Sequence, residues 1–241
     1  MRRSFPMFTT ACLLFWTAMP VAAQAPPSAS AQDAEALKAS YNQAMLAKDW
    51  PGAVANAQQL VSLKATSQNL YFLGNAQLYS GSSDGALATY DRALIAAEQE
   101  KPAEGQAMGG WKDGLSKIYI GRGNALLKLR RTTEAIDTYN YAAEFAANAG
   151  AAYFNVCAVL YNQGNTKDAP AACRKCLQAD PARANAWFIL GSVLFADAPI
   201  DSKGKVAGPA EMREALEKYL SLEPDGAHAA DVKAMLDMIA R

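Results

Sequence analysis

The sequence is poor in the side chains that catalysis and charge-driven binding require. Its 241 residues include a single histidine, His228, and equal numbers of basic and acidic residues, 23 of each. No Walker loop, G-x-S-x-G or H-E-x-x-H motif is present. The balanced, unclustered charge argues against nucleic acid or an anionic membrane surface as the main partner. We therefore expect no enzyme activity, no catalytic residue, no cofactor and no metal site, with His228 facing solvent at the start of a last helix.

Long apolar runs are also scarce, and the one that exists is at the N-terminus. Arg2 and Arg3 precede an apolar stretch that ends in Val21-Ala22-Ala23. This order predicts a secretory signal peptide at residues 1–23, cleaved near Ala23; an uncleaved anchor is the alternative. No other stretch reaches the roughly 20 apolar residues of a membrane span. Loss of residues 1–23 leaves a formal charge of −2. We expect a periplasmic or secreted protein with a flexible leader, rich in Ala, Pro and Ser, at residues 24–33.

The rest of the chain repeats a spacing of small and aromatic residues. Each set has four positions. A small residue comes first, and a second small residue follows it twelve positions later. An aromatic residue or cysteine stands four positions after the second, and another small residue stands three positions after that. The register advances by 34 residues from Gly123 to Cys157 and again to Gly191. The matching sets are Gly74–Ala86–Tyr90–Ala93, Gly123–Ala135–Tyr139–Ala142 and Cys157–Ala169–Cys173–Cys176. A fixed period in this range predicts stacked structural repeats.

Each unit is predicted to be an antiparallel pair of helices. Large apolar residues stand four positions and one position before the first small residue. Trp187 and Leu190, for example, precede Gly191 in this way. This spacing places them on one helical face. A turn such as 81–84 or 164–167 follows, and a second amphipathic helix then begins. Small residues recur where the two helices cross, because a bulky side chain there would push the helices apart.

This pattern resembles the tetratricopeptide repeat (TPR) family. The segment Gly150 to Pro181, with its Asp180-Pro181 end, and the following Trp187–Leu190–Gly191 carry the family's spacing. The resemblance covers residues 34–241 and implies an all-α fold, a right-handed α-solenoid of about five repeats. The units are expected at about 34–66, 67–100, 116–149, 150–183 and 184–224, followed by a capping helix within 226–241.

Two insertions interrupt the period. One lies near residues 99–114 and contains Trp111, which we expect to be exposed. The other lies near 198–209, where Ile200 and Val206 flank a Ser-Lys-Gly-Lys turn that could form a short hairpin. Insertions in repeat arrays commonly become loops on a binding face, although surface loops without any role are also well tolerated.

The three cysteines outside the signal peptide, Cys157, Cys173 and Cys176, fall in one repeat. Cys157 and Cys176 occupy small positions that face each other across the helix pair, so a Cys157–Cys176 disulfide is one expectation. The alternative is that all three serve as small apolar residues. Redox or metal chemistry is a weaker reading, because the C-x-x-C lies inside a helix and no histidine is nearby.

The resemblance also implies a binding surface. In the TPR family the first helix of each pair lines a concave groove that commonly holds an extended peptide. By register, the groove residues here are Tyr71, Asn75, Tyr79, Ile120, Asn124, Phe154, Asn155, Tyr161, Asn185 and Phe188. Asparagine amides can pair with a peptide backbone, and the rings supply apolar contact. Asn124 and Asn155 match the two asparagines of members that bind chaperone tails, but Ile120 and Asn185 replace the lysines that grip a terminal carboxylate.

Three functions are compatible with this reading. The first is an exported scaffold that binds a peptide segment of an envelope protein, the partner being another protein of unknown identity. The second is a structural subunit that self-associates or belongs to an envelope complex. The third is a solute-binding accessory protein, which would require a closed, aromatic-lined pocket.

Overall fold

The computed structural model describes residues 31–239. The predicted signal peptide at 1–23 and residues 24–30 of the predicted leader lie outside this range. The first helix begins at Ala31, three residues before the predicted start of the repeats. No helix of the described chain is long and apolar enough to cross a membrane.

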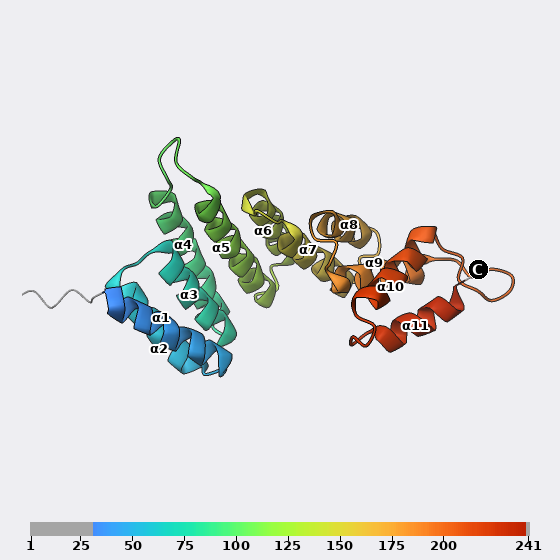
Figure 1. Cartoon of the computed structure of the whole chain (residues 1–241), viewed down its shortest axis with the longest axis horizontal. Coiled ribbons are helices and arrows are strands. Elements are labelled where there is room, and N and C mark those ends of the chain that lie inside the picture. The colour runs from blue at the N-terminus through green and yellow to red at the C-terminus, as the bar shows by residue number, and fades with distance from the viewer. Residues whose placement is uncertain (1–30, 240–241) are drawn as a thin grey trace, which may run out of the picture.

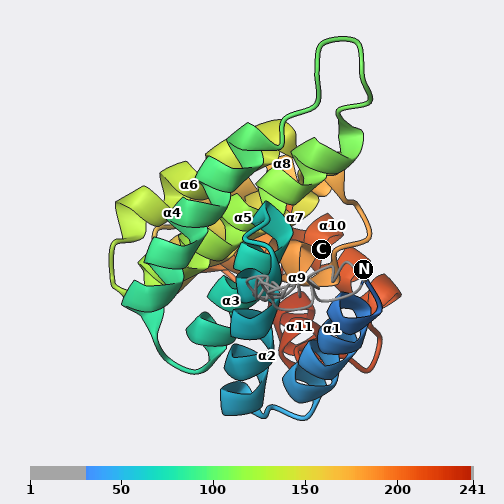
Figure 2. The ribbon, with the colours of Figure 1, turned by 90° about the vertical axis from the view of Figure 1, so that its left-hand side faces the viewer.

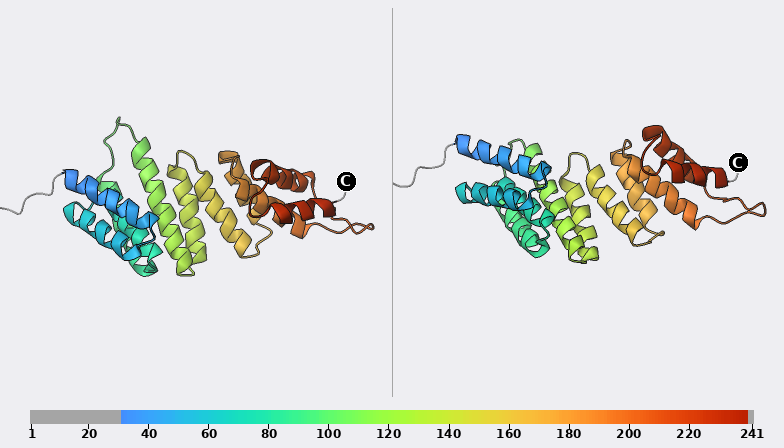
Figure 3. Two further views of the ribbon diagram at one scale, coloured as in Figure 1. Left: turned by 60° about the horizontal axis from the view of Figure 1, so that its bottom comes forward. Right: turned by 90° about the horizontal axis from the view of Figure 1, so that it is seen from below.

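The described chain is an array of helices arranged along one axis in sequence order (Figures 1 and 3). Each helix packs against the next along the chain, from the first to the last. The helices are α1 (Ala31–Leu46), α2 (Trp50–Leu63), α3 (Ser67–Tyr79), α4 (Ser83–Gln99), α5 (Gly109–Lys128), α6 (Thr132–Phe145), α7 (Gly150–Asn162), α8 (Ala169–Ala179), α9 (Ala184–Asp197), α10 (Ala210–Leu222) and α11 (Ala229–Met238). These confirm the predicted all-α array of five helix pairs followed by a cap, α11.

Local sequence sets the helix ends. At the start of α2 the Asp49 side chain accepts a hydrogen bond from the Gly52 backbone N–H at 3.0 Å, and Pro51 stands in the first turn, where its missing N–H does no harm. Gly81 and Gly164, in the turns inside the second and fourth pairs, have φ of +91° and +68°. That left-handed conformation is accessible to glycine at little cost, so these turns reverse the chain sharply.

The small residues of the repeat accept a tyrosine ring from the second helix. A Cβ added to Gly74 would lie 2.7 Å from Cε1 of Tyr90, and one added to Gly123 would lie 2.5 Å from Cε1 of Tyr139. Both rings are fully buried. The ring therefore lies directly against the first helix, and any larger residue at the glycine would displace it.

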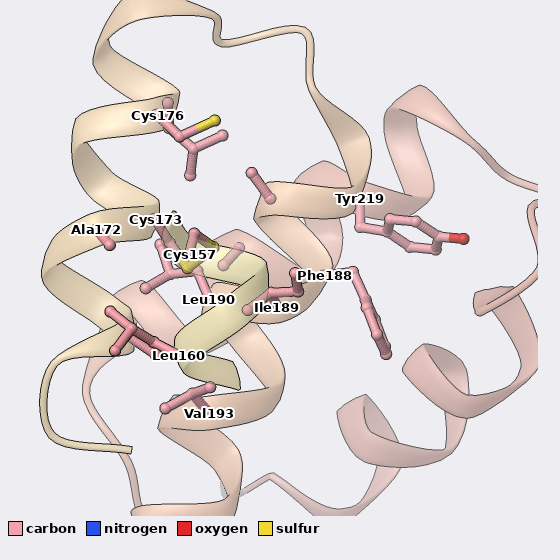
Figure 4. Packing of buried hydrophobic residues seen from close by; sticks show 14 of the residues in the cluster. Cys157, Leu160, Ala172, Cys173, Cys176, Phe188, Ile189, Leu190, Val193 and Tyr219 are labelled. Carbon is pink, nitrogen blue, oxygen red and sulfur yellow. A yellow bond between two sulfur atoms is a disulfide. The ribbon is translucent and has the colours of Figure 1, made fainter. Parts of the chain in front are cut away.

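The fourth pair replaces this glycine–tyrosine contact with a disulfide between Cys157 and Cys173 (Figure 4). The predicted Cys157–Cys176 pairing is therefore wrong. Cys173 occupies the register position of Tyr90 and Tyr139, the residue that reaches the small position of the first helix, whereas Cys176 lies one turn further on. Cys176 is a free, buried thiol, and burial raises its pKa to about 11. A thiol with so high a pKa is a poor nucleophile at neutral pH.

The first insertion is partly loop and partly helix. Residues 100–108 form a loop that stands out from the array (Figure 2), and the remainder lengthens α5 at its N-terminal end. Trp111 is half-buried, which corrects the expected exposure. Its indole Nε1–H donates to the Ala97 carbonyl at 2.7 Å, and its ring lies edge-on to Phe145. The indole thus joins the C-terminal ends of α4 and α6 to the start of α5.

The second insertion forms the short hairpin that the sequence allowed. Ile200 and Val206 make an antiparallel bridge, and the Val206 backbone N–H donates to the Met238 carbonyl at 2.9 Å. Val206 and Ile239 are both buried. A hairpin this short is marginal alone, so its contact with the end of α11 stabilises it.

Candidate functional site

The predicted groove residues come from the first helices of four consecutive pairs. Helix α3 contacts α5, and α7 contacts α9, so first helices of neighbouring units lie next to each other. Seven of the predicted side chains line three hollows on these helices, which differ in what they can bind.

The α7–α9 hollow gathers the largest share of them. It has a volume of about 500 Å³ and is lined by Phe154, Ala158, Tyr161, Asn162, Asn185, Phe188, Ile189, His228 and Asp231. Phe154, Tyr161, Asn185 and Phe188 were expected there from register. His228 and Asp231 were not expected there. His228 immediately precedes α11 and Asp231 lies in its first turn, and the packing of this capping helix has no counterpart in the repeat spacing.

His228 forms part of the wall of this hollow. It is half-buried rather than solvent-facing as expected, and its ring stacks on Phe188 with centroids 3.8 Å apart and planes within 4°. Phe188 is 8% exposed. The guanidinium of Arg183 lies 5.3 Å from the centroid of the Phe154 ring. Phe188 is therefore chiefly a support, while Tyr161 and Asn185 remain accessible.

The predicted Tyr79 and Asn124 meet in a second hollow of about 310 Å³, together with Leu78, Leu127 and Lys128. Tyr79 is 60% exposed and stacks on Trp50, with centroids 5.4 Å apart. This hollow is smaller than the α7–α9 hollow and has one strongly exposed ring at its edge. Asn75 and Asn155 line neither hollow.

Two of the predicted asparagines brace the fold. The Tyr90 hydroxyl donates to Asn75 Oδ1 and the Tyr139 hydroxyl donates to Asn124 Oδ1, each at 2.6 Å. Burial raises the pKa of both tyrosines, so they stay neutral donors. Each asparagine stands one residue after the glycine that faces its tyrosine. The carbonyl oxygens expected to hold a peptide backbone therefore already accept a hydrogen bond within their own helix pair.

Tyr71 lies in a third cavity, which we call the α3–α5 hollow. Its volume is about 510 Å³, and much of its lining comes from the first insertion. The lining residues are Ser67, Gln68, Tyr71, Phe72, Ala97, Glu100, Gly110, Trp111, Asp113, Gly114, Leu115, Lys117 and Ile118. Sequence reasoning treated the insertion and the groove as separate, whereas the structure brings Tyr71 and Trp111 into one cavity.

The described part of the chain shows no cluster of metal ligands. Within residues 31–239, no three or more His, Cys, Asp or Glu side chains come together in a way that could hold a metal ion. The hollows along the first helices are lined by aromatic rings, aliphatic side chains and amides, with a few charged groups.

Solved structures of TPR proteins have a similar fold. YrrB, described as a TPR protein with an unusual peptide-binding site, superposes with a TM-score of 0.51 over 80% of this chain and 88% of its own, at 20% identity. MamA from Desulfovibrio magneticus RS-1, from residue 41 to its end, superposes with a TM-score of 0.56. The superposition covers 83% of this chain and 99% of that structure, at 15% sequence identity. A TPR protein from Parabacteroides merdae superposes with a TM-score of 0.57 over 86% of this chain and 75% of its own, at 17% sequence identity. No family model matches the chain, and no curated protein matches it.

Proposed function

We propose that this chain, which has the tetratricopeptide repeat fold, is an exported scaffold that binds an extended peptide segment of an envelope protein. The observation that carries the proposal is the α7–α9 hollow, where four of the predicted groove residues converge. The similarity to YrrB, a protein described as having a peptide-binding site, supports the same reading.

The lining of the α7–α9 hollow specifies the kind of segment. Phe154 and Tyr161 offer apolar ring surface, and the amides of Asn162 and Asn185 can both donate to and accept from a peptide backbone. Asp231 is the carboxylate in the lining. The segment that fits has one large apolar side chain for the hollow and a lysine or arginine beside it for Asp231.

Replacing Tyr161 and Asn185 together with alanine is expected to weaken peptide binding by one to two decades. A backbone hydrogen bond contributes about 0.5–1.5 kcal/mol, and loss of the ring contact adds to it. The peptide is taken from the partner identified by crosslinking in the envelope and mass spectrometry, and its affinity is measured by calorimetry.

Asn140→Ala is the matched control, because Asn140 is an exposed asparagine on the second helix α6. It should leave the affinity unchanged. The pair Asn124→Ala and Asn155→Ala is a less direct test of binding, since loss of Asn124 also removes the acceptor of the Tyr139 hydroxyl. Unchanged binding in the Tyr161/Asn185 variant, with binding abolished by shortening the 100–108 loop, would assign recognition to the insertion instead.

Export is the second part of the proposal. A disulfide such as Cys157–Cys173 is stable in an oxidising compartment and rare in the cytosol, which supports the predicted signal peptide. N-terminal sequencing of the protein purified from its native source is expected to begin near Gln24. Recovery of Met1 would contradict export by cleavage.

A ring cluster favours self-association as a second candidate function. Tyr141 is 48% exposed and contacts Tyr119 and Phe145, with ring centroids 5.0 Å and 5.4 Å apart. Exposed aromatic surface of this kind is common at protein interfaces. A concentration-dependent dimer in sedimentation that Tyr141→Ser abolishes would favour this function, and a monomer at all concentrations would exclude it.

A further inference from the structure

A further cavity lies at the C-terminal ends of α7 and α9, and we call it the Ser192 cavity. Its volume is about 360 Å³, and it is lined by the end of α7, the turn at 164–166, the C-terminal half of α9 and Met235 of α11. It borders the buried core at Val193 (Figure 4). It shares Tyr161 with the α7–α9 hollow, but the other residues proposed to hold a peptide do not line it.

The hydroxyl of Ser192 is a buried polar group that the fold leaves unsatisfied. Ser192 is 7% exposed, and its Oγ has no hydrogen-bond partner within residues 31–239. No other buried side-chain oxygen or nitrogen in that range lacks a partner. An unpaired buried hydroxyl lowers the stability of a protein, so its presence requires another reason.

The repeat register shows that the helix pair itself does not need this hydroxyl. Ser192 stands at the register position of Asn75 and Asn124, one residue after the small residue of the first helix. In the second and third pairs that asparagine accepts from the tyrosine hydroxyl of the pair. In the fifth pair the matching hydroxyl, that of Tyr219, instead accepts from the backbone N–H of His228 at 3.0 Å. Ser192 thus places a polar group where its own pair supplies no partner.

Apolar side chains make up most of the remaining lining. Val193, Phe195 and Met235 contribute aliphatic, aromatic and thioether surface. The Asn165 amide is already in use, because it donates to Asp168 Oδ2 and accepts from the Asp168 backbone N–H. None of the side chains that line the cavity within residues 31–239 is charged. A charged ligand would lose its hydration here without gaining a counter-ion, so the cavity favours a neutral molecule.

We propose that the Ser192 cavity binds a small, uncharged, mainly apolar molecule that carries one carbonyl oxygen. Rotation about the single side-chain torsion of Ser192 directs its hydroxyl to the ligand, and the carbonyl supplies the acceptor that the fold does not. The apolar body of the ligand contacts Phe195 and Met235, and the flexible methionine side chain adapts to its shape. The volume of the cavity is in the range of small-molecule sites. This site goes beyond the proposed peptide function and does not depend on it.

The test uses Prodan, a neutral naphthyl ketone whose emission shifts to shorter wavelength when it leaves water. We expect saturable binding of Prodan to the purified protein, with blue-shifted emission. Acetophenone should displace Prodan, whereas benzoate at the same concentration should not, because it has a similar ring and carbonyl group but carries a negative charge. Equal displacement by benzoate would contradict the assignment of a neutral ligand.

Ser192→Ala separates a ligand contact from a packing role. The change deletes only the hydroxyl, so we expect Prodan to bind about three- to tenfold more weakly. The melting temperature of the protein without Prodan should rise, because an unpaired buried group has been removed. A packing role alone predicts the higher melting temperature with unchanged affinity, and that result would overturn the proposal.

Ala196→Phe tests the location of the bound probe. Ala196 lines the cavity but is exposed on α9, so a ring there fills part of the cavity without disturbing the core. We expect loss of Prodan binding with an unchanged melting temperature. Ala151→Phe is the matched control, since Ala151 is exposed on α7 and lines neither this cavity nor the α7–α9 hollow.

Three further results would count against the Ser192 cavity. Retained binding in Ala196→Phe, or an equal loss in Ala151→Phe, would show that Prodan binds elsewhere. Loss of Prodan binding in Asn185→Ala would place the probe in the α7–α9 hollow, because Asn185 lines that hollow and not the Ser192 cavity. Failure of the peptide proposal alone leaves these expectations as they are, so the two sites are tested separately.

Discussion

Cys157→Ala/Cys173→Ala is expected to lower the free energy of unfolding by about 3 kcal/mol. The disulfide closes a loop with a sequence separation of 16 residues, and a loop of this length restricts the unfolded chain by about that much. The disulfide also takes the place of the glycine–tyrosine contact found in other pairs. Its loss therefore leaves the α7–α8 contact with neither a covalent bond nor a packed ring. Urea denaturation followed by circular dichroism measures the change, and a reductant added to the unaltered protein should move the midpoint in the same direction.

Cys176→Ala separates the covalent bond from the loss of sulfur volume. Cys176 is buried beside the same helix contact but is unpaired, so this change removes one sulfur atom and should cost about 1 kcal/mol. If Cys176→Ala destabilised the protein as much as the double variant, and reductant had no effect, the pairing assigned to Cys157 and Cys173 would be wrong.

The fold could be predicted because a single spacing encodes it. The 34-residue register marks which residues cross at each helix pair, and the structure confirms the pairs from α1–α2 to α9–α10. The disulfide prediction failed because it matched one small residue to another. Cys173 follows Cys157 by the same number of positions as Tyr90 follows Gly74 and Tyr139 follows Gly123. This equal spacing could have predicted the Cys157–Cys173 pairing.

The site could be predicted only in part, because register assigns a residue to a helix face but not to its partners. One hollow between the neighbouring first helices α7 and α9 is lined by Phe154, Tyr161, Asn185 and Phe188. Asn75 and Asn124 share that face, yet tyrosine hydroxyls of their own pairs occupy them. His228, Asp231 and Trp111 come from the cap and the insertion, whose packing depends on contacts that no repeat spacing describes.

A tight helix crossing against a buried ring makes Gly123→Leu the most disruptive single change that we expect. Even a Cβ at Gly123 would lie 2.5 Å from Tyr139. The ring cannot move aside easily, because it is fully buried and its hydroxyl is held by Asn124. Overpacking a tight core costs about 1–3 kcal/mol, and a rigid ring with no free space favours the upper end of that range. The melting temperature should fall clearly in calorimetry.

Gly109→Leu is the matched control, since it makes the same chemical change where a Cβ meets nothing within 4 Å. It replaces glycine near the start of α5 by a better helix former, so the melting temperature should hold or rise slightly. The contrast between the two positions separates the effect of crowding at a helix crossing from the effect of helix propensity on the melting temperature. Equal melting temperatures for the two variants would mean that Tyr139 does not lie against Gly123, and the glycine–tyrosine contact on which the repeat register depends would have to be abandoned.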